Sequence, residues 1–184
     1  MIEIIPNWHP VFVHFTVALI SIAVMFYWLS FLLVCIEFTK PQLAQEFEIA
    51  GRWCLWLGSL ITIGTVAAGF YAYFTVSHDM PSHIAMTIHR NWALVTAATI
   101  FIVAAWSIHR YFHHKKLSIL FLIALLIVQG LLLTTAWHGA ELVYRHGLGV
   151  ISLPEAEESG HTKPESNETN TSIENTHKQK NHHH

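Results

Sequence analysis

The chain has 184 residues, of which 53% are hydrophobic and only 12% are charged, and its formal net charge is −2. A soluble domain of this size would carry about twice that share of charged residues, so the composition excludes an ordinary soluble protein. The small net charge gives no argument for binding nucleic acid. The two cysteines, Cys35 and Cys54, are too few to suggest a disulfide framework.

Four nearly uncharged runs follow one another along the chain. A helix needs about 20 apolar residues to cross a hydrocarbon core about 30 Å thick, so each run predicts a transmembrane helix. The predicted spans are 11–36, 53–76, 91–108 and 117–137. Because the joins between them are short, sequential helices should pack antiparallel. We therefore predict an all-α fold, a four-transmembrane-helix up-down-up-down bundle over residues 1–151, and we find no internal repeat in it.

The polar tail at 152–184 has almost no apolar residue with which to form a core, and we expect it to be disordered. Its last three residues, the histidines at 182–184, resemble the remnant of a purification tag and are set aside.

Five basic residues flank one predicted membrane face, and two flank the other. The larger group is Lys40, Arg52, Arg110, Lys115 and Lys116, and the smaller is Arg90 and Arg145. Since cytoplasmic loops carry an excess of Lys and Arg, the larger group marks the cytoplasmic face. We therefore predict an integral protein of a bacterial inner membrane with both termini on the periplasmic side.

Histidines are frequent, with 15 in the chain, and seven of them map to the outer half of the bundle. These seven are His9, His14, His78, His83, His89, His138 and His146. Asn7 and Ser82 are residue types that favour the N-cap position, and His14 and His89 each follow such a residue by seven positions. At about 1.5 Å per residue, both histidines would lie roughly 10 Å along their helices.

The fourth helix is expected to continue past its apolar run as far as His146, which places His138 at a similar depth. Three histidines on three helices then share one layer, and Tyr71 would be the contribution of the second helix. Each histidine could simply hydrogen-bond to a neighbour. Ionisable side chains inside a membrane are costly and usually functional, however, so we interpret the layer as a binding site.

A b-type haem needs two imidazoles on different helices, and a four-helix bundle supplies facing positions of that kind. We predict that His14 and His89 are the axial ligands of haem b, and that His138 replaces one of them or hydrogen-bonds to the site. Arg90 and Arg145, near the outer surface, either pair with the haem propionates or anchor their helices at the membrane interface. The predicted function is a membrane cytochrome b that transfers electrons between the quinone pool and a redox partner in the outer compartment.

Two alternatives stay open. Three neutral imidazoles also suit a Zn, Cu or Fe ion in a metal-binding or transport protein, with His14, His89 and His138 as its ligands. Weaker candidate ligands for such an ion are His9, His78, His83 and His146. In the second alternative, the protein is an accessory subunit of a membrane complex whose histidines adjust a helix interface. Whether the chain forms a homo-oligomer is a separate question that the sequence leaves open.

Two segments carry a family resemblance. Residues 9–15, HPVFVHF, and residues 139–150, GAELVYRHGLGV, resemble the signatures HPxxVHF and GGxLVYxxGxGV of a family of predicted four-span membrane proteins of unknown function. Matching positions are His9, His14, His89, Gly139, Tyr144, Gly147 and Gly149, while Ala140 replaces a glycine. The resemblance covers about residues 9 to 150 and implies the four-span fold. The architecture is also loosely similar to four-helix membrane b-type cytochromes, which implies haem held between antiparallel helices.

Overall fold

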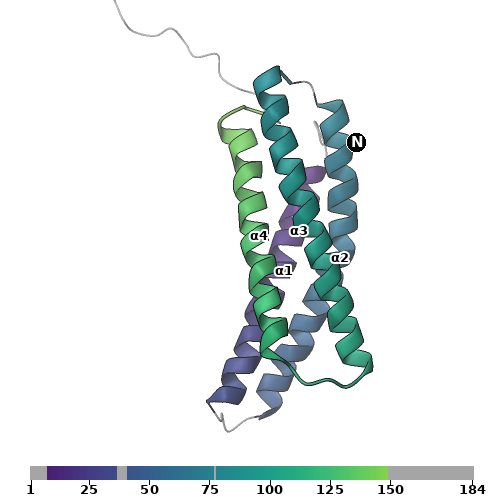
Figure 1. The fold of residues 1–184 in the computed structure, drawn as a ribbon, viewed down its shortest axis with the longest axis vertical. Helices are drawn as coiled ribbons and strands as arrows, with labels where there is room; N and C mark the ends of the chain where they lie inside the picture. The colour runs from purple at the N-terminus through teal and green to yellow at the C-terminus, as the bar shows by residue number, and fades with distance from the viewer. Residues whose placement is uncertain (1–7, 37–40, 77, 149–184) are drawn as a thin grey trace, which may run out of the picture. The chain divides into compact units, whose positions relative to one another are not determined.

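The computed structural model describes residues 8–36, 41–76 and 78–148, which form four α-helices (Figure 1). The helices are α1 (His9–Cys35), α2 (Pro41–Thr75), α3 (Met80–Phe112) and α4 (Ile119–Tyr144). Each is long and apolar enough to cross a membrane, so the predicted all-α fold with four spans is confirmed. Asn7, Gly149 and the tail at 152–184, with its terminal histidines, lie outside the described residues.

The helices extend beyond the apolar runs from which they were predicted. α2 begins at Pro41, inside the predicted loop 37–52, because Gln, Glu and Ala favour helix whether or not lipid surrounds them. α4 ends at Tyr144, two residues before the expected end, and Gly147 then adopts a left-handed φ of 62°. The backbone N–H groups of Gly147 and Leu148 donate to Val143 and Leu142, which closes the helix as glycine commonly does.

The start of α3 differs from the prediction in a way that matters for the site. Its N-cap is Asp79, whose Oδ1 accepts a hydrogen bond from the Ser82 backbone N–H at 3.0 Å, so the expectation of Ser82 as N-cap was wrong. Hydrogen bonds from Ser82 lower the pKa of the Asp79 carboxyl, and the resulting carboxylate complements the partial positive charge of the helix start. His89 therefore lies one turn further along α3 than the sequence suggested.

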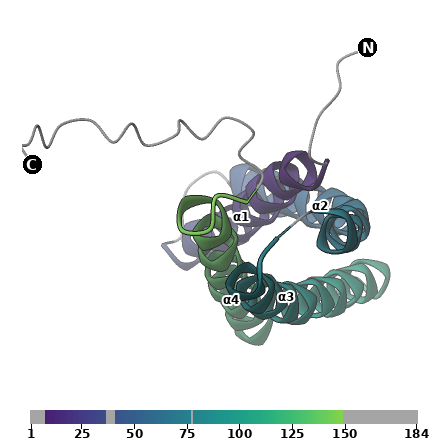
Figure 2. The same ribbon diagram turned by 90° about the horizontal axis from the view of Figure 1, so that it is seen from above.

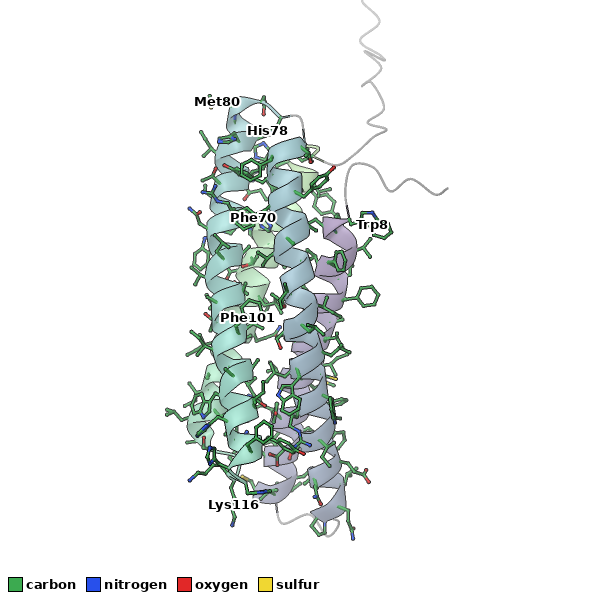
Figure 3. The ribbon with its side chains drawn as sticks, turned by 90° about the vertical axis from the view of Figure 1, so that its right-hand side faces the viewer. Trp8, Phe70, His78, Met80, Phe101 and Lys116 are labelled. Atoms are coloured by element: carbon green, nitrogen blue, oxygen red, sulfur yellow. The ribbon has the colours of Figure 1, made fainter. Side chains whose placement is uncertain are left out.

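Viewed from above, the helices follow one another around a ring in the order α1, α2, α3, α4 (Figure 2). Each contacts its two neighbours in the ring, most closely α1 with α2 and α3 with α4. We call the end at which α1 and α3 begin the histidine end, and the opposite end the basic end. In Figure 3, His78 and Met80 lie at the histidine end, and Lys116 lies at the basic end.

The second hairpin, α3–α4, repeats the burial pattern of the first, α1–α2, which corrects our prediction that no repeat exists. The buried residues of α1 are Thr16, Ile20, Ala23, Val24, Tyr27 and Ser30. The residues 80 positions later are all buried in α3: Thr96, Ile100, Val103, Ala104, Ser107 and Arg110. Four of the six buried residues of α2 correspond to buried residues of α4 at an offset of 70, as Leu55 does to Leu125. Two similar hairpins in one orientation form a parallel repeat.

The interior of the bundle is apolar, and so is much of its outer surface. Ile20, Leu55, Ile100 and Leu125 are at most 1% exposed and belong to one continuous core cluster. Large apolar side chains also cover the outside, among them Phe74 at 78% exposed. Such a surface suits hydrocarbon rather than water as its surroundings.

Candidate functional site

Two histidines face one another across the ring at the histidine end. The imidazole rings of His9 on α1 and His89 on α3 have centroids 6.3 Å apart, and their planes are nearly perpendicular at 76°. Their residue numbers differ by 80, the offset of the repeat, so they occupy equivalent positions in the two hairpins. Each hairpin thus contributes one imidazole to the centre of the bundle.

His9 is held by the second helix of its own hairpin. Its Nδ1 lies 3.0 Å from the Thr65 carbonyl oxygen, and because a carbonyl only accepts, Nδ1 must carry the proton. A neutral imidazole with this tautomer has its lone pair on Nε2. Gly69 lies directly against the ring, since a Cβ built there would be 3.0 Å from His9 Cε1. The glycine therefore makes room for the imidazole.

His89 has the same surroundings in the second hairpin. A Cβ built on Gly139 would be 3.2 Å from His89 Cε1, and the Thr135 backbone lies beside the ring. The His89 Nδ1 is buried, yet it forms no hydrogen bond of acceptable geometry with the described part of the chain. Thr65 and Thr135, like Gly69 and Gly139, are related by the 70-residue offset, so both histidine pockets follow one plan.

A pair of threonines joins the two helices of each hairpin beneath its histidine. The hydroxyls of Thr16 and Thr65 are 2.7 Å apart, and those of Thr96 and Thr135 are also 2.7 Å apart. Thr16 follows His9 by seven residues, and Thr96 follows His89 by seven, so each hydroxyl pair lies about two turns below its imidazole. These hydrogen bonds fix the spacing of the helices that carry the histidine and the glycine.

His138 lies beside this pair but has other partners. Its ring stacks on Trp92 with centroids 6.1 Å apart, and its Nδ1 lies 3.6 Å from a carboxylate oxygen of Glu141. Glu141 also pairs with Arg145 at 3.0 Å. With Trp92 and Glu141 as its partners, His138 flanks the facing imidazoles rather than joining them.

Other residues expected at the site lie elsewhere. His14 is exposed on the outer face of α1, and its Nδ1 donates to the Pro10 carbonyl of the same helix. Tyr71 is 64% exposed. The Arg90 guanidinium donates to Asn91 and lies 4.8 Å from the centre of the Tyr73 ring. The structure therefore brings His9 and His89 together but not His14, Tyr71 or Arg90.

A separate chain of hydrogen bonds runs through the α2–α3 junction. His78 Nδ1 donates to the Val76 carbonyl at 2.7 Å, so its Nε2 accepts from His83 Nδ1 at 2.9 Å. His83 Nε2 then accepts from the Tyr73 hydroxyl at 3.4 Å, and that hydroxyl lies 3.1 Å from Thr87. The two imidazoles stack at 5.1 Å. His146 is not in this chain, since its Nδ1 lies 3.5 Å from the Ser82 hydroxyl.

Within residues 8–36, 41–76 and 78–148, no group of three or more His, Cys, Asp or Glu side chains is arranged to hold a metal ion.

The predicted three-histidine layer reduces to a pair because His14 and His9 are five residues apart. At about 100° per residue, five residues turn about 140° around a helix, so only one of them can face the interior. The sequence contains a signal that could have selected His9. The spacing His-x6-Thr occurs at 9–16 and again at 89–96, and the spacing Thr-x3-Gly occurs at 65–69 and again at 135–139.

Comparison with known proteins adds one match. No curated protein and no solved structure matches the chain. A family model described as "Predicted membrane protein (DUF2231)" matches residues 6–152, which include all four helices and both histidine pockets. The chain therefore belongs to the DUF2231 family of predicted membrane proteins.

Proposed function

We propose that this chain is a membrane b-type cytochrome in which His9 and His89, one from each hairpin, are the axial ligands of a haem at the histidine end. The separation of the two imidazoles carries the proposal. A metal bound to imidazole lies about 2 Å from the nitrogen and the ring centre lies about 1 Å further back, so two rings on opposite sides of one metal have centres about 6 Å apart. The ring centres here are 6.3 Å apart.

The orientation of the ligand pair also suits coordination. Histidines that bind metals commonly donate their second ring N–H to a backbone carbonyl, which fixes the tautomer. His9 does so towards Thr65, and the Thr135 backbone occupies the equivalent position beside His89. Gly69 and Gly139 lie against the Cε1 edges of the two rings. The chain thus orients the His9 imidazole by a hydrogen bond and packs a glycine against each ring.

Haem is favoured over a bare metal ion by the number of donors. A transition-metal ion needs about four ligands, whereas a haem iron needs only two axial ones from the protein. The described residues supply two facing imidazoles and no larger group of donors. A haem held there would supply one-electron transfer, and we propose exchange between the quinone pool and a partner in the outer compartment.

The absorption spectrum of the purified protein tests this proposal. We expect detergent-purified protein, isolated with or without added hemin, to show haem bands that sharpen and shift when dithionite is added. Elemental analysis should find iron in proportion to haem. A colourless protein that does not take up hemin would refute the cytochrome, and stoichiometric zinc or copper in it would instead support a metal site.

We further propose that the histidine end faces the periplasm and the basic end the cytoplasm, because Arg52, Arg110, Lys115 and Lys116 all lie at the basic end. A reporter that is active only in the periplasm should work when fused after Val150 and should fail when inserted beside Lys115. The reverse pattern would place the histidine pair on the cytoplasmic side.

A further inference from the structure

A polar pocket of about 440 Å³ opens at the basic end, opposite the histidine pair. It lies between α1, α2, α3 and the loop after α3. Four of its lining side chains are arginines or lysines, namely Arg52, Arg110, Lys115 and Lys116, and the one carboxylate among its lining residues is that of Glu48. The pocket therefore has a large excess of positive charge.

Arg110 is buried without enough acceptors. It is only 6% exposed, and its Nη2 donates to Glu48 Oε1 and to the Lys115 carbonyl over long distances of 3.4 Å each. Its Nε is buried and has no partner among the described residues. Burying a charged donor without an acceptor is costly, so a further acceptor at the Arg110 Nε would stabilise this arrangement.

Arg52, whose side chain is half-buried, adds a second guanidinium to the pocket. Its Nε is also buried and has no partner in the described part of the chain. Its guanidinium lies 4.4 Å from the centre of the Tyr111 ring, and that of Arg110 lies 4.5 Å from the centre of the Phe121 ring. Stacking on an aromatic ring fixes the plane of a guanidinium and leaves its edge, where the N–H groups point, for an anion.

The first hairpin shows that this position does not require an arginine for packing. The residue equivalent to Arg110, 80 positions earlier, is Ser30, which is 3% exposed. Its hydroxyl donates to the Ala44 carbonyl at 2.7 Å. A small neutral side chain thus fills the same buried position in one hairpin, and the second hairpin carries a charge there instead.

We propose that this pocket binds a phosphate group, with Arg52 and Arg110 donating to its oxygens and Lys115 and Lys116 adding charge at the entrance. Guanidinium groups match phosphate because two parallel N–H groups can reach two oxygens. Basic pockets between membrane helices commonly take phosphate-bearing lipid headgroups, and a soluble phosphate would be bound by the same chemistry. This site is independent of the histidine pair.

Two measurements of melting temperature distinguish a soluble phosphate from a lipid headgroup as the ligand. In one, inorganic phosphate is titrated into detergent-purified protein at constant ionic strength, with chloride as the reference. In the other, the protein is placed in nanodiscs of phosphatidylcholine with or without phosphatidylglycerol. Stabilisation in the first identifies a soluble phosphate, and stabilisation only in the second identifies a lipid headgroup. No response in either measurement overturns the proposal.

Variants show whether the pocket is responsible. Arg52→Gln and Arg110→Gln should each weaken the response about tenfold or more, because a charge-assisted bidentate contact is lost. Arg110→Lys, which keeps the charge but not the two parallel N–H groups, tests the same point if Arg110→Gln does not fold. The matched control is Arg145→Gln, since Arg145 is a 74% exposed arginine at the other end. An equal loss in the control would refute a specific site.

Discussion

Gly139→Val is expected to lower the haem content of the purified protein about 10- to 100-fold while the four helices still form. Even a methyl group at this position would lie 3.2 Å from His89 Cε1, and the branched side chain would push the imidazole out of its place. Displacing a group that orients a ligand typically weakens metal binding by this factor. Haem per protein, measured from the pyridine haemochrome, and helix content by circular dichroism give the two readouts.

The matched control lies nine residues earlier on the same helix. Nothing comes within 4 Å of a Cβ built on Gly130, so Gly130→Val should leave haem content unchanged. Gly69→Val should repeat the loss in the first hairpin, because a Cβ there would lie 3.0 Å from His9 Cε1. Equal haem in the Gly139 and Gly130 variants would show that this glycine does not support a haem ligand.

Most of the fold could be predicted from the sequence because the bilayer imposes a length on apolar runs. The helix ends could not, since polar residues such as those at 41–52 continue a helix after it leaves the hydrocarbon. The repeat also escaped recognition. Apolar residues substitute for one another in a packed core when volume is roughly kept. The two hairpins can therefore bury equivalent positions although few residues at those positions are identical.

The candidate site could be predicted only in part. The positions of the histidines indicate one end of the bundle, and the structure places the His89 ring there, between His9 and Gly139. The chemistry assigned to these histidines stays a prediction. His14 was chosen over His9 because depth was counted from assumed caps at Asn7 and Ser82. The N-cap of α1 is instead Trp8, one residue later, so the error in depth was small. Depth alone ignores which face of a helix a residue occupies.

The two hairpins differ most in what they carry at the basic end. Near the histidine end they share the imidazole, the glycine and the threonine pair. At the basic end, Ser30 of the first hairpin corresponds to Arg110 of the second. A repeated scaffold therefore presents a symmetric pair of imidazoles at one end and, at the other, a group of cations that does not follow the repeat.

The histidine variants are expected to have the largest effect. His9→Ala and His89→Ala each remove one of the two proposed axial ligands, so neither variant should bind haem. His14→Ala should keep it, because His14 lies on the outer face of α1 and bonds to its own helix. Loss of a ligand that binds only the folded protein, present at about a thousandfold above its Kd, lowers stability by about 4 kcal/mol. The two haem-free variants should therefore melt earlier than His14→Ala.

The ratio of haem to protein in these three variants and the wild type tests the central claim that His9 and His89 bind one haem between them. We expect a ratio near that of the wild type for His14→Ala and a ratio near zero for both His9→Ala and His89→Ala. Loss of haem in His14→Ala together with its retention in His9→Ala would contradict this account.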